Sequence, residues 1–533
     1  MKRKILSLVL SAAMMLSMCT IGVSAEETGN WWDDLIIVPE DKNGEISETV
    51  VWEYDVETYT LTIKGTGAIP DSFPGQHPWD DVVETKITKI VVEEGITSIG
   101  EYGFARMREV AEVVLPSTVE SMSNYVFHQC NELKTLTLPP LEAINAGLLD
   151  GSYVENLILP EGVKVIEKLA FANNRRIKTV SLPKTLERIE IGAFSGCLAI
   201  EELTLPESLT YIGGDAFSCC EALKTINIPE GVEKINDLTF YGCENLEEIT
   251  LPENIDLNSF AAFHGCEKLC DEDGYLILND ALLLYTAEVN AEEFVVPDGV
   301  KFVGCLFRGS DNWGYGVEPE VVCKKVVFPD SVEAIADYAF SSNSKVEEIV
   351  LSDNIKAITD ETFYNCTNLK TINLPENLET LGKNAFANCA KLESIEVPAG
   401  VAELCEGAFE NCAELKEITI GKNVEKIELN VFSECMNLTK VQYMGNEKAW
   451  NEIDVAEGND VLLTADITFE ELLKLLGDVD GDGELTASDA LVLRNYIARL
   501  TTIDDINIDL ADAFEDGKIN AKDLLVIRKI LAQ

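Results

Sequence analysis

A cysteine recurs every 23 residues in the middle of the chain, at Cys197, Cys220, Cys243 and Cys266. Each has a phenylalanine three residues before it and an aliphatic residue three residues after it, as Phe217 and Leu223 flank Cys220. A fixed period of this length is typical of proteins built from stacked coils. One coil has an apolar face that it cannot bury alone, so neighbouring coils must stack on it. The spacing therefore predicts a repeat solenoid.

The same frame covers most of the chain. It resumes at Cys366, Cys389, Cys412 and Cys435, again with steps of 23. It extends towards the N-terminus through a proline of each unit, with one step shortened to 21: Pro206, Pro183, Pro160, Pro139 and Pro116. Roughly fifteen coils are expected between Val91 and Tyr443.

Within a coil, the run from Leu369 to Pro375 predicts a short strand that ends at its proline. Residues 376–388 should return by turns, with at most a helical turn. Stacking would join the strands into a parallel sheet on one face. A cysteine that recurs beside Phe and Leu should point inward as a reduced, buried thiol. Cys270, Cys305 and Cys323 lie outside this ladder and are the better disulfide candidates.

The order Ala-Phe, Cys, Leu and Leu-Pro resembles the BspA-like bacterial leucine-rich repeats, over about two thirds of the chain. The resemblance implies an α/β leucine-rich repeat solenoid. It also implies a curved surface that binds other proteins, or host and matrix components, and does not catalyse a reaction.

The N-terminal residues and the net charge indicate where such a protein is located and which partners it can have. Residues 1–25 have the basic start, apolar run and small-residue cleavage site of a signal peptide, which predicts a secreted, extracellular protein. No other apolar run is long enough to span a membrane. The formal net charge of -53 argues against nucleic acid or anionic lipid as a partner, because both would be repelled.

Four segments follow from these patterns. The signal peptide at 1–25 precedes a β-rich cap at 26–90, the solenoid at 91–468 and a different C-terminal module at 469–533. The repeat phase breaks once, in an insertion at 271–323, where a hairpin is expected around Asn279 and Asp280. Trp313 and Tyr315 in this insertion are candidates for ligand contact. The alternative is a surface loop whose tryptophan covers its own base.

The C-terminal module begins with a calcium-loop pattern. Calcium takes six to eight oxygen ligands, and a twelve-residue EF-hand-like loop supplies them at fixed positions. Positions 1, 3, 5, 7, 9 and 12 here are Asp478, Asp480, Asp482, Glu484, Thr486 and Asp489. Glu484 would use its backbone carbonyl, and Gly483 stands where the loop must turn sharply. Carboxylates this close repel one another, so metal binding should be coupled to folding.

The loop and its following helix recur 34 residues later. Two loop-helix units, with Asp at position twelve, resemble a type I dockerin over about residues 476–533. In the second loop Phe514 replaces a ligand, which predicts a weaker second site. The remaining second-loop ligands are Asp512, Asp516, Lys518 through its carbonyl, Asn520 and Asp523.

The dockerin resemblance implies docking onto a cohesin of a scaffold protein in a cellulosome-like complex, attached to the cell surface. Carried over from the family, the cohesin-contacting positions are Ala487, Ser488, Arg494, Asn495, Arg499, Ala521, Lys522, Arg528 and Lys529. Internal symmetry would permit docking in two orientations. The alternative is that these are ordinary solvated helix positions.

Catalysis finds little support in the sequence. Only three histidines occur, and no nucleophile elbow, zinc-protease motif or phosphate loop is present. The expected function is therefore a non-catalytic docking and binding protein. One alternative is a carbohydrate-active or peptide hydrolase of a polysaccharide-degrading complex, with an unrecognised site. Another is a cell-surface adhesin that uses the dockerin only as its anchor.

Overall fold

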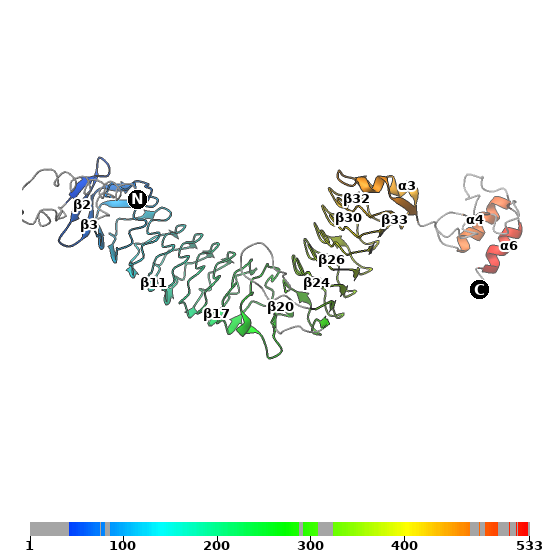
Figure 1. Ribbon diagram of the computed structural model, residues 1–533, viewed down its shortest axis with the longest axis horizontal. Coiled ribbons are helices and arrows are strands. Elements are labelled where there is room, and N and C mark those ends of the chain that lie inside the picture. Colours follow the sequence, from blue (N-terminus) through cyan, green and yellow to red (C-terminus); the bar gives the residue numbers. More distant parts are fainter. Residues whose placement is uncertain are drawn as a thin grey trace, which may run out of the picture.

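The computed structural model describes residues 42–74, 76–79, 86–286, 292–306, 323–469, 479, 486–498, 511, 519 and 521–530. These residues form a parallel-sheet solenoid of about 16 turns and, separately, the helices of a C-terminal module (Figure 1). The predicted solenoid is confirmed.

Each coil has three sides, which we call the first strand row, the second strand row and the turn edge. The first strand row comprises β3 (Thr60–Gly65), β5 (Lys89–Val92), β7 (Glu112–Val114), β9 (Thr135–Leu136), β11 (Asn156–Ile158), β13 (Thr179–Ser181), β15 (Glu202–Leu203), β17 (Thr225–Asn227), β18 (Glu248–Thr250), β21 (Glu293–Val295), β23 (Lys325–Val327), β25 (Glu348–Val350), β27 (Thr371–Asn373), β29 (Ser394–Val397), β31 (Glu417–Ile420), β33 (Lys440–Tyr443) and β35 (Asp466–Phe469). Successive strands pair in parallel in steps of one coil, as Thr225 pairs with Glu248.

The second strand row was not expected from the sequence. It comprises β4 (Gly67–Ile69), β6 (Ile96–Ile99), β8 (Ser121–Met122), β10 (Ala143–Ile144), β12 (Val165–Ile166), β14 (Arg188–Ile189), β16 (Tyr211–Ile212), β20 (Ala281–Tyr285), β22 (Phe302–Val303), β24 (Ala334–Ile335), β26 (Ala357–Ile358), β28 (Thr380–Leu381), β30 (Glu403–Leu404), β32 (Lys426–Ile427) and β34 (Asp454–Val455). Most are two residues long. They stand where a helical turn was allowed, so the coils are made of strands and turns.

The remaining elements lie at the ends and at the insertion. They are β1 (Lys42–Glu45), β2 (Val50–Asp55), β19 (Tyr275–Leu278), the 3₁₀ turns η2 (Glu267–Leu269) and η3 (Asp460–Leu463), and the helices α3 (Glu447–Trp450), α4 (Ala487–Ile497) and α6 (Ala521–Ile530). Strands β1, β2 and β3 are antiparallel neighbours, and β3 then pairs in parallel with β5. The cap segment therefore continues directly into the first strand row.

The recurring phenylalanines and cysteines stack along the turn edge. Phe194, Phe217 and Phe240 stack ring on ring, with centroids 5.9 and 5.7 Å apart. The thiol of Cys220 donates a hydrogen bond to the carbonyl oxygen of Phe194, 26 residues earlier, at 3.3 Å. Equivalent thiols make the same kind of bond in eight further coils, at Cys130, Cys197, Cys243, Cys266, Cys366, Cys389, Cys412 and Cys435. The inward, reduced cysteines are confirmed.

Burial keeps these thiols protonated, because an ionised thiolate would lose its hydration inside the solenoid. It raises the pKa of Cys130, Cys197 and Cys366 to about 12. The residue just before each cysteine turns the chain with a positive φ. Gly242 supplies this conformation before Cys243 and Asn388 before Cys389, which are the residue types that tolerate it best.

Charges alternate along the edge of the first strand row. The position just before the strand is occupied, from β9 to β18, by Lys134, Glu155, Lys178, Glu201, Lys224 and Glu247, and from β23 to β31 by Lys324, Glu347, Lys370, Glu393 and Lys416. Within this charge ladder, Lys224 pairs with Glu201 at 2.6 Å and Lys370 with Glu347 at 2.6 Å. Like charges on adjacent strands repel. If a strand paired with the next coil but one in place of its direct neighbour, like charges would therefore lie side by side.

The apolar core falls into two parts. One runs from Val50 to Leu284, and the other from Leu282 to Leu462. They meet at β20, where two arms of the solenoid join at an angle (Figure 1). We call the described residues of 42–266 the first arm, residues 267–286, 292–306 and 323 the elbow, and residues 324–469 the second arm.

Candidate functional site

In the described part of the C-terminal module, helices α4 and α6 pack on each other. Helix α4 begins with a capping box in which the Thr486 hydroxyl accepts a hydrogen bond from the Ser488 amide at 3.1 Å. In return, Asp489 accepts from the Thr486 amide at 2.7 Å. These bonds satisfy backbone donors that have no partner within the helix, and so they fix where α4 starts.

Asp489 also ties the helix to the beginning of the predicted calcium loop. Its second carboxylate oxygen accepts from the amide of Val479 at 2.7 Å, and the side chain is fully buried. One carboxylate thus holds both ends of the loop. Each carboxylate oxygen has a second lone pair that can face a cation. A buried, hard oxygen donor at loop position twelve fits calcium.

The other metal ligands expected from the sequence are only partly covered. Thr486 is described, at the N-cap of α4. The side chains of Asp478, Asp480, Asp482, Glu484, Asp512, Asp516, Lys518, Asn520 and Asp523 lie outside the described residues. Among the described residues no cluster of metal-binding side chains occurs. The ligand set therefore stays a prediction.

The two helices repeat each other's burial pattern at a spacing of 34 residues. Leu493 and Ile527 are equivalent and fully buried, together with Val479 and Ala511. Ser488 and Lys522 are equivalent and exposed, as are Arg494 and Arg528. Both helices thus bury one face and present a matching opposite face. Asn495 is half-buried beside Arg494, whose guanidinium donates to it at 3.3 Å.

Two leucines on these faces were missed as candidate contacts. Leu491 is 47% exposed and its equivalent Leu525 is 54% exposed. Leu491 lies three residues from both Ser488 and Arg494, so the three share one face of α4. The sequence contained the signal: a leucine recurs after 34 residues, each time between two predicted cohesin-contact positions. Ala487 is exposed too, whereas Arg499 and the side chains of Ala521 and Lys529 lie outside the described residues.

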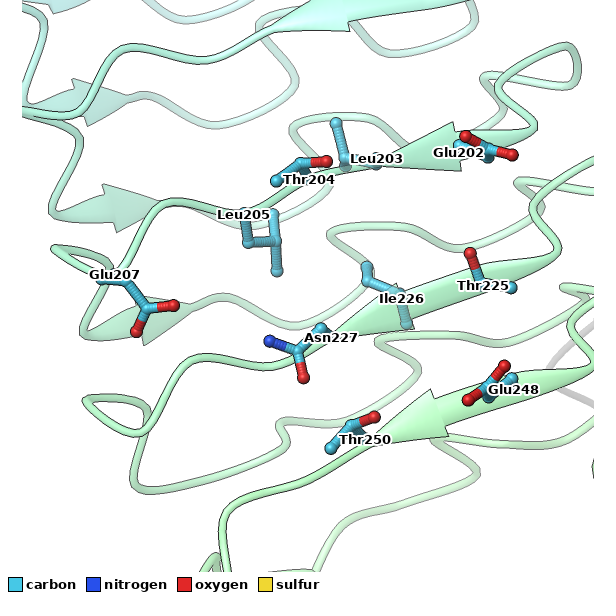
Figure 2. A pocket seen from close by; sticks show the side chains of 10 residues that line it. All are labelled: Glu202, Leu203, Thr204, Leu205, Glu207, Thr225, Ile226, Asn227, Glu248 and Thr250. Atoms are coloured by element: carbon cyan, nitrogen blue, oxygen red, sulfur yellow. The ribbon is translucent and has the colours of Figure 1, made fainter.

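The solenoid has an open hollow of about 370 Å³ on its first strand row, over β15, β17 and β18. Figure 2 shows Glu202, Thr225 and Glu248 in line across the three strands, with Asn227 and Thr250 further along. Leu203, Thr204, Leu205, Glu207 and Ile226 complete the lining. Its rim is acidic and hydroxyl-rich, and it carries no aromatic platform for a sugar ring.

Comparison with protein families decides the class of the solenoid. The model of the BspA type leucine rich repeat region matches in six copies, over residues 83–147, 142–270 and 322–451, which is more than half of the chain. The chain belongs to the BspA-type leucine-rich repeat family. In this BspA-type protein a second model, the type I dockerin domain, matches residues 476–532.

Solved structures give similar proteins at low identity. A leucine-rich repeat protein from Bacteroides ovatus is 20% identical, with 80% of this chain and 100% of that chain covered and a TM-score of 0.39. A leucine rich cell surface protein from Faecalibacterium prausnitzii is 20% identical, with 78% and 98% covered and a TM-score of 0.31. The pneumococcal vaccine antigen PcpA is 18% identical, with 80% and 98% covered and a TM-score of 0.32. The comparison with curated proteins found no match.

The insertion of this BspA-type protein contains the predicted hairpin. Strands β19 and β20 pair antiparallel around Asn279 and Asp280, which confirms that prediction. Among the described residues, Cys270, Cys305 and Cys323 form no disulfide bond with one another or with another cysteine, so the expected disulfides are not found there. The Cys305 thiol instead faces the carbonyl oxygen of Tyr338, at 3.6 Å. Trp313 and Tyr315 lie outside the described residues.

The two matched domains, a leucine-rich repeat and a dockerin, are non-catalytic kinds. Across the described ranges, no helix combines the length and the apolar character needed to cross a bilayer.

Proposed function

We propose that this protein is a non-catalytic, secreted component that docks through its C-terminal module onto a cohesin of a cellulosome-type scaffold. The dockerin match over residues 476–532 carries this proposal. The scaffold would then hold the protein outside the cell, attached to its surface. The solenoid would be the part presented for binding.

Calcium would be held in the first loop by the three aspartates 478, 480 and 482, by the carbonyl of Glu484, and by Thr486 and Asp489. When bound, the ion supplies a positive charge that lets these carboxylates stay close together. Asp489 supports this role, because its carboxylate already closes the loop onto α4. The second loop would bind more weakly, since Phe514 offers no oxygen.

The cohesin-binding surface would be the matching exposed faces of α4 and α6. Leu491 and Leu525 would supply apolar contact area, and the cationic Arg494, Lys522 and Arg528 would surround it. Apolar anchors ringed by arginine are typical of strong interface positions. The two faces differ at Ser488 and Lys522, which would favour one docking orientation.

Charge reversal on each face tests this assignment. Arg494→Glu with Asn495→Glu alters the first face, and Lys522→Glu with Arg528→Glu alters the second. We expect the variant with all four changes to lose about 2 kcal/mol or more of cohesin-binding free energy, roughly thirtyfold in Kd by calorimetry. The face whose variant alone weakens binding is the preferred one. Unchanged affinity in the fourfold variant would contradict the proposal.

The matched control reverses two exposed charges elsewhere, Lys422→Glu with Lys448→Glu on the second arm. It introduces charge without touching the module, so cohesin affinity should stay unchanged. Calcium affinity, measured on each variant, separates damage to the metal site from damage to the docking face.

The solenoid's ligand would be a protein or a host or plant-matrix component. The hollow over β15, β17 and β18 favours a protein segment with a basic side chain, because Glu202, Glu207 and Glu248 surround it. A pull-down with the full chain and with a Glu202→Gln, Glu248→Gln variant, under 0.1 and 0.5 M salt, tests this. Capture that survives both the variant and the salt would place the ligand elsewhere.

Two other functions remain to be tested beside this one. If the protein is instead a hydrolase of a polysaccharide-degrading complex, screening it on polysaccharides and peptides should give turnover. If it is an adhesin that uses the dockerin only as an anchor, the chain shortened before residue 469 should still adhere to its target.

A further inference from the structure

A recurrent hydrogen bond joins neighbouring coils at the start of the turn edge. In the first arm, Asp237 accepts a hydrogen bond from the backbone amide of Phe260, 23 residues on, at 2.8 Å. In the second arm, Asp360 accepts from the amide of Lys383, also 23 residues on, at 2.8 Å. An oxygen-bearing side chain of one coil thus fixes the turn of the next coil. This bond marks which coils are direct neighbours on the turn edge.

At the elbow a similar bond, whose acceptor Asn258 stands two positions earlier in its coil, spans 79 residues. The amide of Asp337 donates to the side-chain oxygen of Asn258 at 3.3 Å, and the Asn258 amide group donates to the Asp337 carboxylate at 3.5 Å. Phe260, two residues after Asn258, and Tyr338, directly after Asp337, meet edge to face, with centroids 5.8 Å apart. We call these four residues the latch. Here the turn edge of the first arm contacts that of the second arm directly.

At the elbow, the second strand row contains two strands more than the turn edge has coils. Asn279 donates to the carbonyl of Pro252, so the rung at Asp280 follows the coil of Asn258. Lys301 then donates to Asp280 and Glu333 to Lys301, each backbone to backbone at 2.8 Å. On the second strand row, the strands β20 and β22 therefore lie between the two arms, whereas on the turn edge the arms touch directly at the latch. With neighbouring strands about 4.8 Å apart, this side gains about 10 Å over the turn edge.

Such unequal sides must bend the solenoid towards its turn edge. Figure 1 shows the arms meeting at an angle at β20, where the two apolar cores also meet. We propose that the elbow is a built-in hinge: the two extra rungs act as a wedge, and the latch of Asn258 and Asp337 with Phe260 and Tyr338 holds the arms at their angle. The latch, a contact between residues far apart in sequence, then sets the distance between the binding surfaces of the two arms.

Distance measurement across the elbow tests this. Fluorophores are attached through unnatural amino acids at Lys184 and Lys422, which are exposed on different arms, in the full chain. The latch variant carries Asn258→Ala and Asp337→Ala. We expect its single-molecule distance distribution to broaden and its mean to lengthen by the order of one strand spacing, about 5 Å.

The matched control removes the same bond inside each arm, with Asp237→Ala and Asp360→Ala, and should keep the wild-type distance. Asp337→Asn retains an oxygen acceptor and the backbone amide, so it should also keep that distance. It remains informative if the alanine variant fails to fold by circular dichroism. In that case Asn258→Asp, which places a second carboxylate opposite that of Asp337, should widen the distance distribution at pH 7. A latch variant identical to wild type, or a control that moves equally, would overturn the proposal.

Discussion

The solenoid and the C-terminal module order their chains by different forces. In the solenoid most coils add one more ring to a stack and one more thiol-carbonyl bond, so order propagates from neighbour to neighbour. In the described part of the module, the fully buried apolar residues are Val479, Leu493, Ala511 and Ile527. A domain as short as the matched residues 476–532 can bury little apolar surface, so a bound metal is expected to contribute much of its stability.

The difference shows where each region is vulnerable. The solenoid divides its stability over many equivalent contacts, and one damaged coil keeps intact neighbours on both sides. The module concentrates its order at one point, where the buried Asp489 joins both ends of the calcium loop to α4. Removing a cation there should have a far larger effect than removing any one contact of the solenoid.

Chelation should therefore separate the two regions most clearly. We expect EDTA to abolish cohesin binding and the thermal transition of the module, because the loop carboxylates then repel one another. The transition of the solenoid should not move. Differential scanning calorimetry of the full chain with EDTA and after calcium is restored measures both. A module that melts at the same temperature without calcium would contradict this comparison.

A core substitution should damage the solenoid and spare the module. Phe217 is fully buried between Phe194 and Phe240, so Phe217→Ala leaves a cavity in the stack. We expect a loss of about 3–5 kcal/mol of unfolding free energy in urea, with calcium-dependent cohesin binding retained.

Leu463→Ala provides the control, because this side chain is 84% exposed and should be nearly neutral. Equal urea midpoints for the two variants would mean that the phenylalanine stack contributes no more than a surface residue does.

Residues that act within one coil or between adjacent coils were predictable. The 23-residue phase placed Cys220 and Phe217 inside, and alternation with a turn signal placed the hairpin of β19 and β20. Each of these depends on neighbours a fixed step away. Periodicity alone therefore revealed most of the fold.

Features that depend on breaks in the phase were not predictable. The latch joins Asn258 to Asp337 across 79 residues, and no repeat relates those positions. Leu491 and Leu493 are both leucines of α4, and only the packing of α4 on α6 decides that Leu493 is buried and Leu491 is exposed. The hollow of Figure 2 arises from three adjacent strands together, so no single coil carries its pattern.

The smallest effect concerns the charge ladder. The hydrogen bond from Lys370 holds the pKa of Glu347 below its usual range. A carboxylate whose folded pKa is depressed stabilises the fold above its unfolded pKa, and that contribution disappears as pH falls through the folded pKa. Lys370→Glu places a third carboxylate between Glu347 and Glu393, so it should lower the urea midpoint slightly at pH 7. The pair is exposed, and the effect should be small.

The deficit of Lys370→Glu should shrink below about pH 4, where the carboxylates become protonated, and also in 1 M salt. Lys184→Glu is the control, because it adds the same charge change at an exposed position outside the ladder. If the deficit persists at low pH and in salt, it arises from packing of the lysine stem, and the alternating charges contribute only to the choice of neighbouring coil.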